Sequence, residues 1–389
     1  MIKILSVIVL LSSSMLALSF DEFLNNALKN SPYLKSHDLS IKQASLQGKI
    51  LTRYENPLVE LEYSDFKPDI GSRESGYRVA LEQPLRLWGV GSDKENLALS
   101  SKKEAQASYL LSRAQLTKGI SLLFTEYAQE HELYSLAQEE LYIALRIYEI
   151  SQARFQAGTI SEGVMLQAKV DYEMIDIDLD SLKLSFNEHY FKLLEIAGYS
   201  QEIELNHSYI FRVKDTVTST SNPDLKLINA VKKKALTKAE VDSNKVEFVN
   251  LLAEFENEPD QDIFRVGISV PLTLFNTKKE ETQIAKLEVG KAEFYAKKES
   301  DKITLKTAKL NQERELLQKL KIKNNATLKT QEKLLKMFEE SYKIANVNLL
   351  ELQNVKNRVI KTKEFLIKIK SALDVNAIKT NYIAGAYNE

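Results

Sequence analysis

The sequence contains one long stretch twice, and this duplication narrows the folds open to the chain more than any other feature. Three motifs of the first copy recur in order in the second: Arg78-Val79 as Arg265-Val266, Pro84-Leu85 as Pro271-Leu272, and Ile196-Ala197-Gly198 as Ile383-Ala384-Gly385. The two members of every pair are 187 residues apart, so the copies differ by no net insertion between these points. We infer that a rigid element fixes the length of each copy.

Long helices meet this requirement. None of the seven prolines lies between Pro84 and Pro223 or after Pro271, and a proline inside a helix costs about 3 kcal/mol or more. Apolar residues also recur at helical spacing, as at Leu116 and Ile120, with charged residues on the other faces. We therefore expect two long helices that each continue into a shorter return helix, over about 92–157, 160–197, 277–344 and 347–385.

The turns between these helices carry matching signals. The first turn is Gly158-Thr159-Ile160-Ser161 and the second is Ala345-Asn346-Val347-Asn348. We expect Gly158 to adopt the left-handed conformation with which many helices end, because glycine has no Cβ to oppose it. Thr159-x-x-Glu162 and Asn348-x-x-Glu351 have the capping-box pattern with which a helix begins.

The residues before each long helix alternate with a period of two. Apolar residues occupy every second position in four short segments, namely Val59 to Tyr63, Tyr77 to Leu81, Leu251 to Phe255 and Phe264 to Val270. We expect two β-hairpins, over about 56–86 and 247–275, that are apolar on one face. Strands of about ten residues can cross a membrane when tilted, but ribbons half-buried on a soluble domain would show the same alternation.

Residues 1–19 have the features of a secretory signal peptide. Lys3 gives the positive start, Ile4 to Leu11 form the apolar run, and Ala17-Leu18-Ser19 is a small-x-small cleavage site that would leave Phe20 as the first mature residue. No other segment reaches the roughly 18 consecutive apolar residues of a transmembrane helix. The chain has no cysteine, which excludes disulfides and a lipid-modified cysteine, and its net charge of −1 gives no reason to expect a nucleic-acid partner.

The chain therefore divides into this signal peptide, a first repeat at 20–198, a connecting segment at 199–221 and a second repeat at 222–389. Each repeat begins with a helical region before its hairpin, and the second begins at Asn222-Pro223, where asparagine can cap the helix and proline can occupy its first position. The expected fold class is mainly α with a small β part, internally duplicated.

Four strands are too few to form a membrane barrel in one chain, because the smallest known barrels have eight. An open sheet edge in lipid would leave backbone groups unpaired at several kcal/mol each. If the strands lie in a bilayer, the protein must therefore oligomerise, and two, three or four chains all satisfy this argument.

At this point the residues resemble a known family, the TolC-like outer-membrane efflux proteins. The resemblance rests on the duplication and on short motifs in a characteristic order: Glu82-Gln83-Pro84-Leu85, Arg154 to Ser161, Leu166-Gln167-Ala168, Asn222-Pro223 and Val270-Pro271-Leu272. It covers essentially the whole mature chain.

The resemblance implies a homotrimer with a twelve-stranded β-barrel in outer-membrane lipid and an α-helical barrel in the periplasm. Such a protein is the exit duct of a tripartite efflux or type I secretion system, and its helical tips meet a periplasmic adaptor (membrane fusion) protein that links it to an inner-membrane pump. The adaptor-docking residues would be those of the two turns, namely Gly158, Thr159, Ile160, Ser161, Ala345, Asn346, Val347 and Asn348.

The resemblance also implies that Glu351 lies at the periplasmic aperture, because the family often has an acidic residue six positions after the place of Ala345. The first repeat has Val164 at the corresponding position, so each chain would contribute one carboxylate. A first-turn glutamate that only caps its helix is an equally good interpretation. The chain departs from the family pattern at Ala345, where glycine is usual, and at Gln353, where leucine is usual.

Other classes of protein find little support. The four histidines, His37, His131, His189 and His207, show neither the spacing of metal ligands nor a partnered nucleophile, so we expect no enzyme, cofactor or metal site. The stretch Gln83 to Leu87 resembles the heavy-metal (RND-type) efflux members of the family, but the sequence has no cluster of metal ligands to support a metal cargo. The alternative that the sequence leaves open is a secreted periplasmic coiled-coil scaffold without channel activity. The cargo, whether drug, metal, peptide or protein, is not specified.

Overall fold

The computed structural model describes residues 17–67, 69–214 and 221–387. Most of the expected signal peptide, residues 1–16, lies outside the described residues. The chain forms two compact units, and both contain parts of each repeat. Unit 1 comprises Met1–Pro32, Arg113–Ser219 and Thr304–Glu389, and unit 2 comprises Tyr33–Ser112 and Thr220–Ile303.

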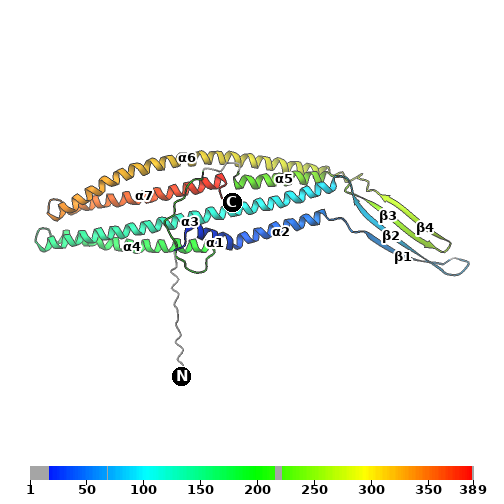
Figure 1. Cartoon of the computed structure of the whole chain (residues 1–389), viewed down its shortest axis with the longest axis horizontal. Helices are drawn as coiled ribbons and strands as arrows, with labels where there is room; N and C mark the ends of the chain where they lie inside the picture. Colours follow the sequence, from blue (N-terminus) through cyan, green and yellow to red (C-terminus); the bar gives the residue numbers. More distant parts are fainter. Residues whose placement is uncertain (1–16, 68, 215–220, 388–389) are drawn as a thin grey trace, which may run out of the picture. The chain divides into compact units, whose positions relative to one another are not determined.

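Seven helices are present in the described residues: α1 (Phe20–Asn30), α2 (Pro32–Thr52), α3 (Val90–Gln156), α4 (Glu162–Ala197), α5 (Pro223–Ser243), α6 (Lys279–Lys343) and α7 (Leu349–Ala384) (Figure 1). The long helices α3 and α6 contain 67 and 65 residues, and each returns through a tight turn into a helix of 36 residues. Among the described helices, none combines the length and the apolar composition that crossing a bilayer would require.

The helix boundaries lie within two residues of the prediction, and two differences have a structural cause. Helix α4 begins at Glu162 with Ser161 as its N-cap, whereas the hydroxyl of Thr159 donates to the carbonyl of Arg154 and so does not form the predicted capping box. The second hairpin ends at Ser269, six residues before the predicted end. Pro271 follows closely, and a proline has no N–H to donate to a strand ladder.

The four strands form one antiparallel sheet in unit 2 with the order β1-β2-β3-β4. They are β1 (Leu58–Phe66), β2 (Glu74–Arg86), β3 (Phe248–Glu258) and β4 (Gln261–Ser269). The central pairing of β2 with β3 joins the two repeats, for example at Val79 opposite Phe255. Within the part of the chain that the structure describes, β1 pairs only with β2 and β4 only with β3, so the sheet has two open edges.

The register places the predicted apolar residues on one face. Leu61 lies opposite Val79, and Ala253 lies opposite Val266. The side chains of this face are exposed, Leu61 at 75% and Val266 at 66%. The other face carries charges that pair across strands, as Arg78 does with Glu60 at 3.0 Å. The sheet is therefore apolar on one side and ion-paired on the other, as the alternation predicted.

A carboxylate ties the two repeats together where the helices of unit 2 meet the sheet. Glu247, directly before β3, accepts from Lys94 at 2.9 Å and from Lys278 at 2.8 Å. Lys94 lies in the first turns of α3, and Lys278 directly precedes α6. The bond from Lys278, more than any other contact, lowers the pKa of Glu247, so this carboxylate stabilises the junction at neutral pH and loses that effect as the pH falls through its lowered pKa.

The core of unit 1 gathers aromatic residues around the start of α1. Phe20 packs against Phe124 of α3 and against Tyr209 and Phe211 of the connecting segment, with ring centroids 4.6 to 4.9 Å apart. The residue pair Leu18 and Leu205 forms a parallel bridge beside this cluster, and Ser19 caps α1 through a capping box with Glu22. The connecting segment therefore packs on the helices of unit 1 through its aromatic side chains.

Candidate functional site: the helical tips and the α7 face

The two tips have the same backbone motif. In the first, the N–H of Thr159 donates to the carbonyl of Arg154; in the second, the N–H of Asn346 donates to the carbonyl of Ser341. Both bonds close the turn with which a helix ends when the residue directly before the donor is left-handed. Gly158 has φ +73°, which confirms the predicted conformation, and Ala345 has φ +64°. A side chain at such a φ is strained by about 1–2 kcal/mol.

Side-chain contacts join the two tips. Tyr342 of α6 is fully buried, and its hydroxyl lies 2.8 Å from the hydroxyl of Ser151 on α3. Arg154 of α3 donates to the carbonyl of Tyr342 at 2.9 Å, and its guanidinium lies over the tyrosine ring at 4.6 Å from the centroid. These contacts hold the ends of the two hairpins at the same level.

A groove of about 500 Å³ separates the two tips. It is lined from both sides, by Ile150, Ala153, Arg154, Ala157 and Thr159 of the first hairpin and by Lys343, Ile344 and Ala345 of the second. Two of the predicted docking residues, Thr159 and Ala345, therefore face a common apolar groove with two cations at its border. The other predicted tip residues belong to the same turns, but they do not line this groove.

Glu351 caps α7, as expected if this residue is a first-turn helix cap. Its side chain accepts from the N–H of Asn348 at 3.2 Å, and its own N–H donates to the side chain of Asn348 at 2.9 Å. The residue is exposed, so its charge faces solvent beside the tip. Val164, the corresponding residue of the first repeat, packs against the apolar cluster of Leu349 and Leu352 instead.

A buried lysine, which sequence analysis missed, binds α7 to the first hairpin near the tips. The ammonium of Lys356 lies 2.8 Å from Asp171 on α4 and 3.4 Å from Glu140 on α3, and its side chain is 1% exposed. Burial raises the pKa of Glu140, and the charge of Lys356 opposes this shift. The three residues are far apart in the sequence, so no local pattern could have indicated this site.

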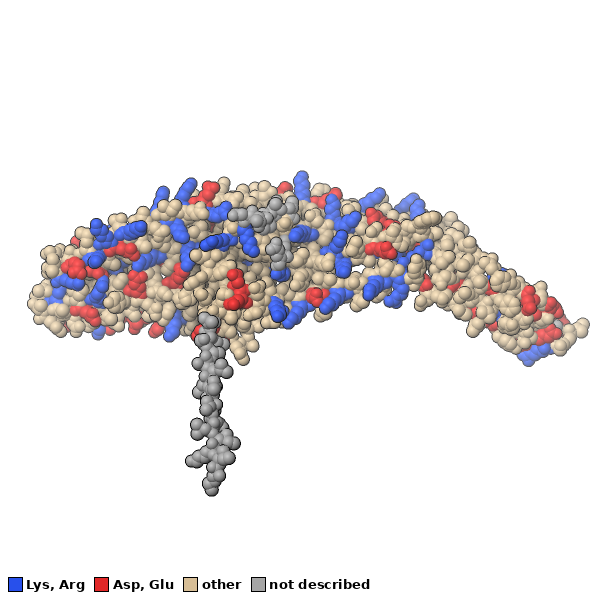
Figure 2. Space-filling view, in the orientation of Figure 1, with Lys and Arg blue, Asp and Glu red and all other residues tan. Residues whose placement is uncertain are grey.

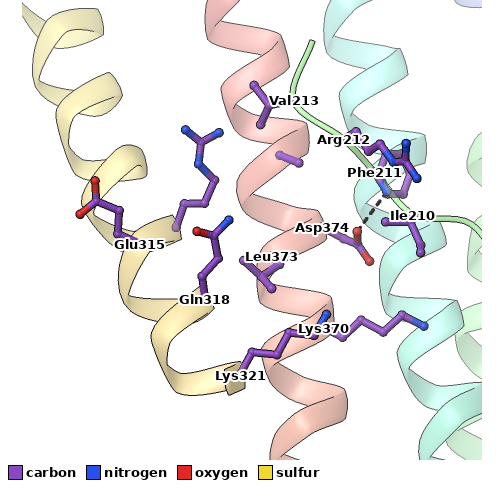
Figure 3. A pocket seen from close by; sticks show the side chains of 12 residues that line it. Ile210, Phe211, Arg212, Val213, Glu315, Gln318, Lys321, Lys370, Leu373 and Asp374 are labelled. Carbon is purple, nitrogen blue, oxygen red and sulfur yellow. Dashed lines mark hydrogen bonds between the residues drawn. The ribbon is translucent and has the colours of Figure 1, made fainter. Parts of the chain in front are cut away.

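A second feature of α7 lies where the connecting segment crosses it (Figure 3). Asp374 is 7% exposed and accepts the N–H of Phe211 at 3.0 Å, while Asn381 accepts the N–H of Lys214 and donates to the carbonyl of Arg212. Burial raises the pKa of Asp374 to about 6, against the opposing effects of this bond and of Lys370. Ionised Asp374 therefore costs folding free energy above pH 6, a cost that disappears as the pH falls.

Two of the four histidines contact each other, which their positions in the sequence did not indicate. His131 of α3 and His207 of the connecting segment stack with their ring centroids 3.6 Å apart. Burial, together with His207, lowers the pKa of His131. No group of three or more possible metal ligands occurs in the described ranges, so this pair packs the connecting segment on α3 without forming a metal-binding cluster.

The left-handed residues of the two tips give a matched pair of substitutions. We expect Ala345→Gly to raise the free energy of unfolding by about 1 kcal/mol, because glycine removes the strain of the positive φ. Gly158→Ala should lower it by a similar amount, and for conformational reasons alone, since no atom lies within 4 Å of the position of the added Cβ. Denaturant unfolding followed by circular dichroism measures both changes; two shifts of the same sign would contradict this explanation.

Lys356→Met should destabilise the protein by about 3 kcal/mol, because it leaves two partly buried carboxylates without their cation. The deficit should shrink as the pH falls, since protonation of Glu140, whose pKa burial raises, removes one of the unpaired charges. Lys363→Met is the matched control on the same helix, because Lys363 is more exposed and pairs with Glu139 at 2.6 Å. It should cost at most about 1 kcal/mol. Equal losses for both variants, measured by denaturant unfolding, would show that burial of Lys356 is not decisive.

Comparison with known proteins shows the fold of the chain and a family match over its first repeat. Residues 23–198 match the outer membrane efflux protein family. No curated protein matches the chain. Among solved structures, the chain is similar to the Campylobacter jejuni CmeC outer membrane channel, with a TM-score of 0.75, 15% identity and coverage of 94% of this chain and 85% of that chain.

The outer membrane protein VceC of Vibrio cholerae gives a TM-score of 0.75 and 15% identity over 94% of this chain and 95% of its own. The Neisseria gonorrhoeae MtrE outer membrane channel, solved in its open state, gives a TM-score of 0.75 and 15% identity over 93% of this chain and 88% of its own. The resemblance inferred from the sequence is therefore confirmed: residues 23–198 match the outer membrane efflux protein family, and the chain has the TolC-like fold of its channels.

Proposed function

We propose that this chain is one of three protomers of the exit duct of a tripartite efflux or type I secretion system, which passes substrates from the periplasm to the exterior. The observation that carries the proposal is the open sheet of unit 2, with an exposed apolar face and an ion-paired opposite face, in a chain whose first repeat matches the outer membrane efflux protein family. Export through a signal peptide, predicted at residues 1–19, would deliver the chain to the envelope; cleavage after Ser19 would remove the bridge of Leu18 to Leu205 and the cap of α1.

The sheet supports assembly in a membrane. The N–H and C=O groups along β1 and β4 need partners in lipid, and the matching edges of neighbouring copies can supply them. Three copies give twelve strands in a closed barrel, which exceeds the minimum of eight. Leu61 and Val266 would then face lipid, while the ion pairs of Arg78 and of Arg265 would face a wet interior.

The helical tips fit a periplasmic adaptor that would connect the duct to an inner-membrane pump. The groove between the tips has an apolar lining with Arg154 and Lys343 at its border, so it suits a partner tip with apolar and acidic side chains. The same backbone turn on both hairpins would present six similar tips in a trimer. All eight residues of the two turns belong to this proposed docking surface.

Glu351 would close the periplasmic aperture. Three exposed copies around one axis would form a ring of carboxylates, which favours cations and repels anions. Its capping role is compatible with this position, because the first turn of α7 lies directly after the tip.

Reconstitution tests the proposed function. The purified protein in detergent should have the mass of a trimer by light scattering, and in planar bilayers it should give discrete conductance steps. A monomeric protein without conductance that leaves the membrane fraction on carbonate washing would instead fit a periplasmic scaffold.

Glu351→Gln tests the aperture. Glutamine can also complete a capping box, so the variant removes the charge and keeps the cap. We expect a trimeric channel with weaker cation selectivity and weaker block by divalent cations. Glu162→Gln, a first-turn glutamate of α4 with no ion pair in the structure as described, is the control and should leave both properties unchanged. Unaltered selectivity and block in trimeric Glu351→Gln would leave Glu351 as a helix cap only.

A further inference from the structure

A pocket of about 510 Å³ lies in unit 1, between the connecting segment, α6 and α7 (Figure 3). Its volume is within the range of small-molecule binding pockets, roughly 300–1,000 Å³. A single chain supplies all the residues that line it, and the function proposed above makes no use of it. The pocket is therefore a candidate for a second role.

The apolar part of the lining comes from two elements. Helix α7 contributes Leu373 and Ala377, and the connecting segment contributes Ile210, Phe211 and Val213. Ile210 remains 60% exposed, so the packing of the segment on α7 leaves apolar surface in water. An apolar lining with a few polar groups at fixed places is typical of pockets that bind small organic molecules.

The polar groups of the pocket are mainly cations. Four basic side chains line it, namely Arg212, Arg314, Lys321 and Lys370. Lys370 forms an ion pair with Glu132 of α3. Within the ranges that the structure describes, the other three take part in no ion pair. Their charges are therefore available to an anion.

The two carboxylates of the lining do not cancel this charge. Asp374 is 7% exposed and accepts the N–H of Phe211 at 3.0 Å, so its carboxylate is directed at the backbone of the connecting segment. Figure 3 shows Glu315 on the side of α6 that faces away from α7, whereas Lys321 extends from α6 toward α7. The pocket thus combines an apolar lining with a positive border.

The surroundings extend the positive field. Residues 304–343 of α6 carry ten basic side chains and five carboxylates, and Figure 2 shows basic side chains along this helix. Arg314 and Lys321 are seven residues apart, so they lie on one face of α6, two turns from each other. A surface with one sign of charge raises the local concentration of small ions of the opposite sign.

We propose that this pocket binds small carboxylic acids that have an apolar body. The carboxylate would pair with Arg314 or Lys321 on the wall formed by α6, and the planar guanidinium of Arg314 suits a bidentate contact. The apolar body would cover Ile210, Phe211 and Leu373. A bound acid would then connect α6 to the connecting segment and hold that segment on the helices.

Phenylbutyrate tests the proposal on the full-length protein in nanodiscs of zwitterionic lipid, with empty discs as the blank. Saturation-transfer NMR measures its affinity beside those of phenylbutanol, which lacks the charge, and acetate, which lacks the apolar body. We expect phenylbutyrate to bind at least about tenfold more tightly than either, because only it engages both parts of the pocket. Equal affinities for the acid and the alcohol would overturn the proposal.

Two double variants locate the site. Arg314→Gln/Lys321→Gln should lower the affinity for phenylbutyrate to that for phenylbutanol and leave the alcohol unaffected. Lys319→Gln/Lys323→Gln removes the same charge from the same helix at positions outside the lining, and it should retain the affinity within roughly twofold, since distant charges are screened. Equal losses in both variants would assign the effect to the net charge of α6, and the proposed pocket would be wrong.

Hydrogen exchange tests the hold on the connecting segment. The N–H groups of Phe211 and Lys214 donate to Asp374 and Asn381 of α7. Phenylbutyrate should slow the exchange of the peptide that contains both amides, and it should have no effect in Arg314→Gln/Lys321→Gln. Unchanged exchange at saturating phenylbutyrate would place the acid elsewhere and overturn the proposal. A trimeric, conducting protein that binds no phenylbutyrate would refute this inference and leave the proposed function standing.

Discussion

The unpaired backbone of β1 and β4 is the constraint on which the rest of this molecule depends. A sheet edge can be left in water, where solvent satisfies it, but not in lipid, where each unpaired group costs several kcal/mol. The strands are apolar on the exposed face and ion-paired on the other, a pattern that suits lipid on one side and water on the other. In the function proposed above, one chain therefore supplies part of a barrel, and further copies of the chain complete it.

The fixed length of the repeats follows from a second requirement, at the other end of the helices. The tips meet through Arg154, Ser151 and Tyr342, which hold the two turns at one level. An insertion in one long helix would displace one tip along the axis and rotate its faces, since a helix rises 1.5 Å and turns about 100° per residue. The contacts between the tips would then be lost. The need to keep these contacts explains why the two repeats hold a constant offset of 187 residues.

Features that depend on a local pattern could be predicted from the sequence, and features that depend on several helices could not. The alternation in the strands predicted the faces of the sheet, and glycine at position 158 predicted its left-handed turn. The capping box predicted at the adjacent Thr159 does not form, because the hydroxyl of Thr159 donates to the carbonyl of Arg154 in the preceding helix. Lys356 reads as one more lysine of an amphipathic helix, and only the meeting of α3, α4 and α7 makes it a buried ion-pair centre. The stacking of His131 on His207 required the path of the connecting segment, which no periodicity describes.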